Sequence, residues 1–264
     1  TVGVELRIKN PPLIANSPYL IRRGVLITLY VISMFFASAF VGLTYAVQRR
    51  WTVALGVFVG FLFILNQGYW EETTESLTLI LSACVVCMGL GVPIGIAAAH
   101  RPRLYAGMQP VLDLMQTLPT FVYLIPAVAF FSVGKTPAVI ATVIFALAPM
   151  IRLTSLGIQE VPKDAVEAAV AHGASPWQTL IKVQLPLARR SLLLGINQTL
   201  VMSLSMVVVA ALIGAGGLGY DVMTALRNIK GGEGMLAGAA IVLCALIPDR
   251  IIQSSLRKQA PTYS

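Results

Sequence analysis

Long runs of apolar residues alternate with short polar breaks along most of the chain. A run of roughly 20 apolar residues is long enough to cross a bilayer as a helix, so the pattern predicts an all-α polytopic membrane protein with about seven transmembrane helices. We expect these helices near residues 24–47, 52–68, 77–99, 107–133, 138–155, 191–214 and 235–253. Pro110, Pro119 and Pro126 predict that the fourth span is broken, because proline lacks the amide donor that a continuous helix needs.

The composition agrees with a membrane protein. Hydrophobic residues make up 57% of the chain and charged residues 11%, whereas a soluble domain holds about 25% charged residues. The net charge of +8 fits lipid headgroups and cytoplasmic loops rich in Lys and Arg better than it fits nucleic acid. With the N-terminus outside, most of the 19 Lys and Arg residues, Arg152 among them, fall on the cytoplasmic side, although Arg22 and Arg23 do not. This topology places residues 160–190 in the cytoplasm.

Residues 167–186, EAAVAHGASPWQTLIKVQLP, form a water-compatible stretch between two apolar spans. Pro162 suits a first helical position, Asp164 favours a helix N-terminus, and Gly173 can adopt the left-handed conformation that ends a helix. Ser175 and Gln178 form a capping-box pattern for a second helix, which Pro186 should kink or end. The stretch therefore predicts two short helices with a defined corner.

Two other interpretations of this stretch remain open. A helix–turn–helix also occurs in DNA-binding proteins, but the second helix offers little beyond Gln178 and Lys182 to read bases or bind phosphates, and both ends are tied to membrane spans. A purely structural loop is the second alternative.

The spacing Glu167-Ala168-Ala169, three residues, Gly173, nine residues, Val183-Gln184-Leu185-Pro186 resembles the EAA loop of ABC importer permeases. The family usually has Ile at the position of Val183, which keeps the apolar contact. The resemblance implies that this loop is a coupling helix seated in a groove of a cytoplasmic ATPase, with Glu167 facing a basic ATPase residue. The implied coupling residues are Glu167, Ala168, Ala169, Gly173, Ala174, Ser175, Pro176, Leu185 and Pro186.

Further stretches narrow the resemblance. Residues 115–124 (MQTLPTFVYL), 145–154 (FALAPMIRLT), 195–200 (GINQTL) and 214–219 (GAGGLG) resemble the permease of glycine betaine/proline-type importers, over roughly residues 75–255. Residues 1–75 are expected to form an N-terminal segment with two predicted membrane helices, and the first 70 carry no motif of this family. The resemblance implies a five-helix type I, MetI-like core at 76–258 that includes the coupling loop 160–190.

The same resemblance implies the partners of the chain. They are two cytoplasmic ABC ATPase subunits that bind ATP and magnesium, a periplasmic or lipid-anchored substrate-binding protein, a second copy of the permease, and the lipid of a bacterial inner membrane. We expect no nucleic-acid partner, no cofactor in this chain and no enzyme activity of its own.

No catalytic or metal-ligating constellation stands out in the sequence. Gly134-Lys135-Thr136 resembles the end of a phosphate-binding loop, but position 129, where the first glycine is needed, is Ala. His100 and His172 have no partners at metal-ligand spacing. Cys84 and Cys87 lie in an apolar run, where free thiols usually behave as small hydrophobic groups.

Polar and aromatic residues inside the spans are the candidates for a solute pathway. Asn197, Gln198, Thr199 and Ser203 share one predicted span, where polar groups face protein or water. Phe121, Tyr123, Phe130 and Phe131 could offer ring faces to a quaternary ammonium group. Helix–helix hydrogen bonding and ordinary packing are the alternative roles. An ion-coupled secondary transporter of a small polar solute is the alternative function, although the centres of the spans hold almost no carboxylates.

Overall fold

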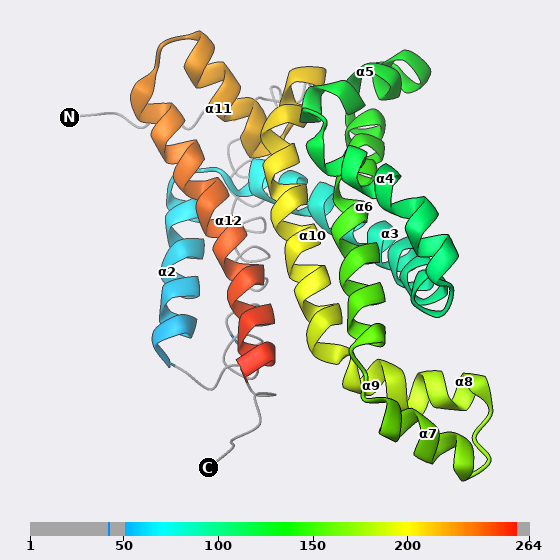
Figure 1. The fold of residues 1–264 in the computed structure, drawn as a ribbon. Coiled ribbons are helices and arrows are strands. Elements are labelled where there is room, and N and C mark those ends of the chain that lie inside the picture. Colours follow the sequence, from blue (N-terminus) through cyan, green and yellow to red (C-terminus); the bar gives the residue numbers. More distant parts are fainter. Residues whose placement is uncertain (1–41, 43–50, 258–264) are drawn as a thin grey trace, which may run out of the picture. The chain divides into compact units, whose positions relative to one another are not determined.

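The computed structural model describes residue 42 and residues 51–257, and the regular elements in this part of the chain are helices. Two compact units divide the chain, with the boundary between Glu71 and Glu72. The predicted span 24–47 lies outside the described residues, apart from residue 42. Figure 1 shows the helices of the second unit, which carry the predicted 160–190 loop.

The described part of the first unit contains α2 (Trp51–Asn66), close to the predicted span 52–68. The chain turns after this helix at Gly68, which has a φ of +77°. The rings of Phe61 and Trp70 lie 6.2 Å apart at an angle of 55°, a tilted arrangement that aromatic pairs favour.

Three described helices of the chain are long and apolar enough to cross a bilayer. They are α3 (Trp70–His100), α6 (Lys135–Gln159) and α10 (Arg189–Ala210), which η2 (Ala211–Ile213), one 3₁₀ turn, prolongs. These helices lie where the apolar runs predict them. The C-terminal helix α12 (Gly231–Arg257) is apolar over the shorter stretch Gly231–Leu246.

Helix α6 is longer than its apolar run predicts. The run indicates a span at 138–155, but the helix continues to Gln159. Arg152, which the predicted span 138–155 already contains, lies inside α6, so the prediction that counts it among the cytoplasmic loop residues is wrong. Its guanidinium tolerates this position because it donates to the carboxylate of Asp113.

The predicted break in the fourth span is confirmed. The run forms α4 (Pro102–Thr117) and α5 (Thr120–Phe131), which meet at an angle of 97°. Leu118 has extended backbone angles, as the residue before a proline prefers, and Pro119 is the N-terminal capping position of α5. Pro110 and Pro126 lie inside α4 and α5 without ending them.

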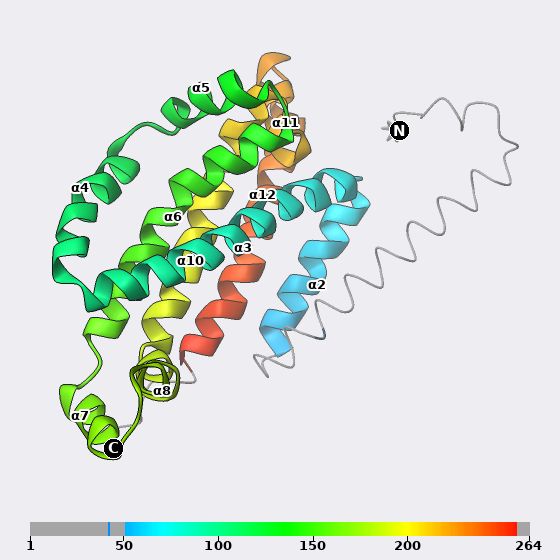
Figure 2. The ribbon, with the colours of Figure 1, turned by 90° about the vertical axis from the view of Figure 1, so that its right-hand side faces the viewer.

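Helices α6 and α10 run side by side, and α3 crosses α6 closely (Figures 1 and 2). A Cβ atom added at Gly91 would lie 2.8 Å from Met150 Cγ, and one added at Gly95 would lie 2.6 Å from Thr154 Cβ. These glycines let the two helices approach closely, as small residues do in membrane helix pairs. A Cβ atom at Gly157 would likewise lie 2.6 Å from Ser191 Cβ, where α6 meets α10.

The second unit has two distinct ends. The loop end carries the helices between α6 and α10, and the far end carries α5, the start of α6 and the short helix α11 (Gly217–Arg227). Since α3, α6 and α10 run between the two ends, a contact at one end can affect the other through a single helix.

Candidate functional site

The loop end holds a small helical unit formed by residues 162–187, which we call the loop unit. It consists of α7 (Lys163–Ala171), α8 (Pro176–Thr179), the π-helical turn η1 (Leu180–Gln184) and α9 (Leu185–Leu187). Pro162 is the N-terminal capping position of α7 rather than its first helical residue, and Asp164 lies in the first turn, as predicted. Figure 2 shows the unit beyond the ends of α6 and α10.

The corner between α7 and α8 has the local chemistry that the sequence predicts. Gly173 ends α7 with a φ of +78°, and Ala174 N–H donates to Ala169 O at 3.1 Å. In the capping box, Gln178 N–H donates to Ser175 Oγ at 3.3 Å and Ser175 N–H donates to Gln178 Oε1 at 2.9 Å. Reciprocal bonds of this kind satisfy donors that a helix start leaves free, so the corner is rigid.

Pro186 does not end the second helix. The chain stays helical through Leu187, and Ala188 N–H donates to Gln184 O at 2.8 Å. The preceding residues instead widen into the π-helical turn, in which Leu185 N–H donates to Leu180 O. A proline in a regular helix would crowd the carbonyl four residues before it, and the wider turn relieves this crowding at Lys182 O.

Apolar packing anchors the loop unit to the membrane helices. Leu180 and Ala188 are buried against Ile158 and Val161 at the end of α6, with Leu185 beside them. This packing fixes the unit to the ends of α6 and α10.

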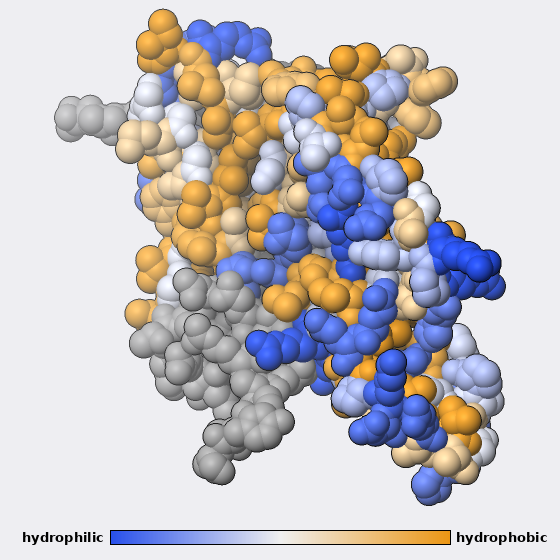
Figure 3. Space-filling view, in the orientation of Figure 1, coloured by the Kyte–Doolittle hydropathy of each residue, from blue (hydrophilic) through white to orange (hydrophobic). Residues whose placement is uncertain are grey.

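The rest of the loop unit faces outward. Val170, Trp177 and Ile181 are 58%, 68% and 44% exposed, although Trp177 and Ile181 belong to the apolar face of the second helix. Figure 3 shows this end as mainly hydrophilic with small apolar patches. Of the predicted coupling residues, the exposed ones are Glu167, Ala168, Gly173, Ser175, Pro176 and Pro186, and the half-buried ones are Ala169, Ala174 and Leu185. Such a surface is suited to binding a partner protein.

The predicted pathway aromatics lie on α5 but do not gather at one place. Tyr123 is buried, and its hydroxyl donates to Met115 O at 2.9 Å, which ties α5 to the end of α4. Phe121, Phe130 and Phe131 are exposed, with Phe130 at 83%. Tyr123 therefore braces the bend of the broken span.

The predicted polar pathway residues divide in a similar way along α10. Thr199 is buried and its hydroxyl donates to Ala146 O of α6 at 3.4 Å, while Ser203 Oγ lies 3.9 Å from Cys84 Sγ of α3. Gln198 is exposed. Asn197 is half-buried, and its Oδ1 has no hydrogen-bond partner among the described residues.

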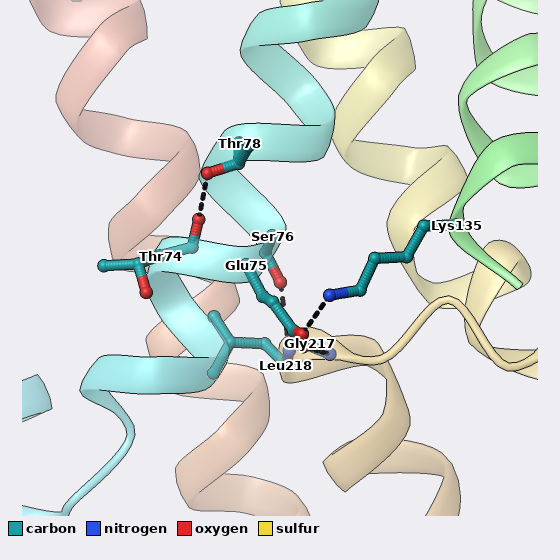
Figure 4. A network of polar contacts seen from close by, with 7 residues as sticks. All are labelled: Thr74, Glu75, Ser76, Thr78, Lys135, Gly217 and Leu218. Atoms are coloured by element: carbon teal, nitrogen blue, oxygen red, sulfur yellow. Dashed lines mark hydrogen bonds and ion pairs between the residues drawn. The ribbon is translucent and has the colours of Figure 1, made fainter.

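A polar network at the far end explains the glycine-rich stretch 214–219 (Figure 4). Glu75 Oε2 of α3 accepts from Gly217 N–H at 2.8 Å, and Ser76 Oγ accepts from Leu218 N–H at 3.0 Å. The other carboxylate oxygen of Glu75 pairs with Lys135, the first residue of α6. The carboxylate and the hydroxyl thereby satisfy free donors at the start of α11.

Glycine is required where the network approaches α11. Gly216 and Gly217 have φ angles of +78° and +69°. A Cβ atom at Gly216 would lie 2.6 Å from Glu75 Oε2, and one at Gly217 would lie 2.5 Å from Ser76 Oγ. The sequence shows a glycine motif at this place, but not that its partners are Glu75 and Ser76.

Asp221 lies on α11 close to the same carboxylates. Burial, and after it the negative charges of Glu72 and Glu75, raise the pKa of Asp221 to about 6 from its ordinary value near 3.8. The far end thus contains a carboxyl group whose charge is unfavourable at neutral pH.

The contact between α3 and the loop unit has no signal in the sequence pattern. His100 Nε2, at the end of α3, lies 3.1 Å from Gln184 Oε1, and its Nδ1 lies 2.9 Å from Ile96 O. His100 and Gln184 are 84 residues apart in the chain, and only the fold brings them together. Among the described residues, no group of three or more His, Cys, Asp or Glu side chains could hold a metal ion.

Comparisons with known proteins agree with this geometry. A family model described as "Binding-protein-dependent transport system inner membrane component" matches residues 91–258. The glycine betaine transport system permease protein OpuAB of Bacillus subtilis (strain 168) is 45% identical over 85% of this chain and 79% of its own. The glycine betaine/carnitine transport permease protein GbuB of Listeria monocytogenes serotype 1/2a (strain 10403S) is 47% identical over 80% of this chain and 74% of its own.

A solved structure shares the fold. It is an inward-facing conformation of the MetNI methionine ABC transporter, with a TM-score of 0.60 and 23% identity. The match covers 74% of this chain and 94% of that chain. The fold is therefore the MetI-like one that the sequence predicts.

Proposed function

This chain belongs to the family of binding-protein-dependent transport system inner membrane components, and we propose that it moves glycine betaine or a related methylated amine into the cell. It is the permease subunit of an ABC importer, a transport component rather than an enzyme. The observation that carries the proposal is the loop unit, which is rigid, packed on α6 and α10, and outward-facing over its remaining surface.

In this proposal, the loop unit is the docking element for an ATPase subunit on the cytoplasmic side of a bacterial inner membrane. The exposed apolar side chains of Val170, Trp177 and Ile181 would fill a groove of the ATPase, since large exposed apolar groups on a polar surface mark binding sites. Glu167 would pair with a basic ATPase residue. Ala168 and Gly173 are small, exposed and permit close approach. The ATPase subunit would bind ATP and magnesium and carry out hydrolysis.

Movement would pass from the loop unit into the membrane through the apolar cluster at its base. Because Leu180 and Ala188 pack against Ile158 and Val161, a displacement of the unit displaces the ends of α6 and α10. Two such units, driven together by two ATPase subunits, would rock the paired helices and open a central cavity outward. This is alternating access by largely rigid-body motion.

We further propose a homodimer that receives solute from a periplasmic or lipid-anchored binding protein. Each chain supplies one loop unit, and two ATPase subunits need two of them. Two copies of the permease would enclose the cavity, and lipid would cover the remaining apolar faces of α3, α6, α10 and α12.

The solute pathway is proposed along α5 and α10. The exposed Phe121, Phe130 and Phe131 present ring faces, which attract a quaternary ammonium group by about 0.5–2 kcal/mol each. Asn197 and Gln198 present amide groups on α10, suited to the carboxylate of a betaine. Tyr123, Thr199 and Ser203 would act behind them, through the bonds that hold the helices in place.

The substrate class rests on the relatives. OpuAB is named for glycine betaine and GbuB for glycine betaine and carnitine. Proline betaine, choline and trimethylamine N-oxide share the methylated cationic nitrogen and belong to the same chemical class. The binding protein would make the finer choice among them.

Reconstituted uptake tests the proposal. Proteoliposomes containing this chain and its ATPase, with the binding protein added outside, should accumulate radiolabelled glycine betaine when ATP is enclosed. Liposomes with an ATPase that binds but does not hydrolyse ATP should not. Uptake that needs no ATPase and follows a sodium or proton gradient would instead support the ion-coupled carrier.

A further inference from the structure

Helix α3 reaches both ends of the second unit. It contains 31 residues, which corresponds to about 46 Å at 1.5 Å per residue. Its last residue, His100, lies against the loop unit, and Glu75 and Ser76 near its start hold α11. A single helix therefore joins the proposed ATPase-docking element to the far end.

At the loop end, both polar and apolar contacts tie α3 to the second helix of the loop unit. His100 Nε2 lies 3.1 Å from Gln184 Oε1, and Nδ1 lies 2.9 Å from Ile96 O, so the ring lies between the α3 backbone and the Gln184 side chain. Ile96 and Ala99 pack on the cluster that contains Leu180. Gln184 closes the π-helical turn, so a movement of that turn acts on α3 directly.

Over its last third, α3 packs closely against α6. A Cβ atom at Gly95 would lie 2.8 Å from the backbone atom Ile151 O, and one at Gly91 would lie 2.9 Å from Met150 Cβ. The two glycines therefore let the backbones of α3 and α6 lie so close that no side chain would fit between them. They therefore behave as one stiff pair over this length.

At the far end, Glu75 joins three elements. Its carboxylate pairs with Lys135 of α6 and accepts from Gly217 N–H at the start of α11. Lys135 and Glu75 are 63% and 37% exposed, so the ion pair alone contributes little. The bond from Gly217 N–H contributes more, because a carboxylate at a helix N-terminus makes charge-assisted bonds to free donors.

Helix α11 also forms the surface of the far end. Tyr220, Leu226 and Ile229, in this helix and the turn after it, are 46%, 68% and 93% exposed. A displacement of its N-terminus would therefore move a surface that is open to other molecules on that side of the membrane.

We propose that α3 transmits movement between the loop unit and α11, with His100 and Glu75 as positioning residues at its two ends. The inference rests on the proposed function, because it assigns a path to the same ATP-driven movement. It adds a route through α3 to the one through α6 and α10. Docking of the binding protein at the far end would affect the ATPase by this route, and ATP binding would move α11 by the same route in the opposite direction.

The test measures how strongly the solute-loaded binding protein stimulates ATP hydrolysis by the full complex in proteoliposomes. We expect His100→Ala and Glu75→Ala each to lower the stimulated-to-basal ratio, roughly threefold to tenfold. Assembly with the ATPase should be unchanged, as judged by co-purification. His100→Gln can still hydrogen-bond to Gln184 and should restore most of the ratio. Glu75→Gln keeps an acceptor for Gly217 N–H and should fall between the parent and Glu75→Ala.

The double variant separates transmission from local damage. His100 and Glu75 are separated by about 37 Å of helix, and effects of such distant sites usually multiply as independent factors. Transmission through α3 predicts that His100→Ala with Glu75→Ala loses no more than the stronger single variant. As a matched control, Glu233→Gln changes a far-end carboxylate at the start of α12 that pairs with Lys230, the residue before this helix. Its combination with His100→Ala should show independent effects.

Independent losses in the His100–Glu75 double variant, or single variants within twofold of the parent, would overturn transmission through α3. This result differs from failure of the proposed function, in which the parent complex itself shows neither ATP-driven uptake nor stimulation by a binding protein.

Discussion

The guanidinium of Arg152 on α6 donates to the carboxylate of Asp113 on α4. The pair joins the first half of the broken span to the helix that leads into the loop unit. Arg152 is the less exposed partner, at 29% against 57% for Asp113, and its Nε has no bond partner among the described residues. If one partner were removed, water could therefore solvate the remaining charge of Asp113 better than that of Arg152.

This asymmetry predicts that Asp113→Asn destabilises the protein more than Arg152→Gln does. Loss of the negative charge leaves a partly buried cation without its counter-charge, at a cost of about 1–3 kcal/mol. Loss of the cation leaves a carboxylate that water can reach. Thermal unfolding in detergent measures both. Equal losses, or a larger loss for Arg152→Gln, would contradict the asymmetry.

Two glycines of α3 provide a packing test. Gly95→Val should lower the free energy of unfolding by about 1–3 kcal/mol, the usual cost of overpacking, because the new side chain would overlap Thr154 and Ile151 O of α6. Gly89 has no heavy atom within 4 Å of an added Cβ, so Gly89→Val is the matched control. A similar melting temperature for the two variants would show that α3 and α6 are not in close contact.

If the loop unit couples the permease to the ATPase, a substitution on its exposed surface should impair ATPase docking without lowering the stability of the permease. Glu167 is exposed, so Glu167→Lys should leave the melting temperature of the isolated permease unchanged. It should, however, remove ATP-driven uptake and weaken co-purification of the ATPase. Glu233→Lys makes the same charge change at the far end and should retain co-purification. Normal uptake by Glu167→Lys would remove this residue from the proposed docking surface.

Replacing Asp221 by Asn should stabilise the protein to an extent that depends on pH. The pKa of Asp221 is about 6 in the folded protein and near 3.8 in the unfolded chain, so the folded state binds more protons between these pH values. The stability that the protonated carboxyl group contributes is therefore lost as the pH rises through about 6. Asparagine carries no charge at either pH, so Asp221→Asn should raise the melting temperature by roughly a few degrees at pH 7.5 and change it little at pH 4. A gain of the same size at both pH values would contradict the origin in charge burial.

The aromatic residues of α5 predict two different phenotypes. Tyr123→Phe removes the hydroxyl that donates to Met115 O and should cost about 1 kcal/mol of stability, with little change in the KM for uptake. Phe121 is exposed, and Phe121→Ala should raise the KM for a quaternary amine without lowering the melting temperature. The reverse pattern would assign solute contact to Tyr123 and packing to Phe121.

The local features of the loop unit could be predicted because they depend on neighbouring residues. The capping box at Ser175 and Gln178, the positive φ of Gly173 and the break at Pro119 each follow from one or two side chains. The continuation of the helix through Pro186 could not be predicted, because it depends on a π-helical turn that packing on Leu180 and Ala188 supports.

The contacts that link the ends of the second unit could not be predicted, because their partners are far apart in sequence. Glu75 and Gly217 are separated by 142 residues, and His100 and Gln184 by 84. Polar residues in apolar runs were equally ambiguous. Thr199 and Ser203 make interhelical contacts, whereas Gln198 on the same helix is exposed, and periodicity alone does not distinguish these roles.

The most direct test of the account is the reaction of one cysteine at the loop unit. The native thiols Cys84, Cys87 and Cys244 are buried, whereas Ala168 is exposed, so Ala168→Cys should be the position that reacts. In intact cells it should resist a membrane-impermeant maleimide, whereas in inside-out vesicles it should react with this reagent. In a parallel sample of these vesicles, a bifunctional maleimide should cross-link it to a cysteine of the ATPase. Labelling in intact cells, or inside-out vesicles in which no ATPase ever cross-links, would contradict a cytoplasmic docking element.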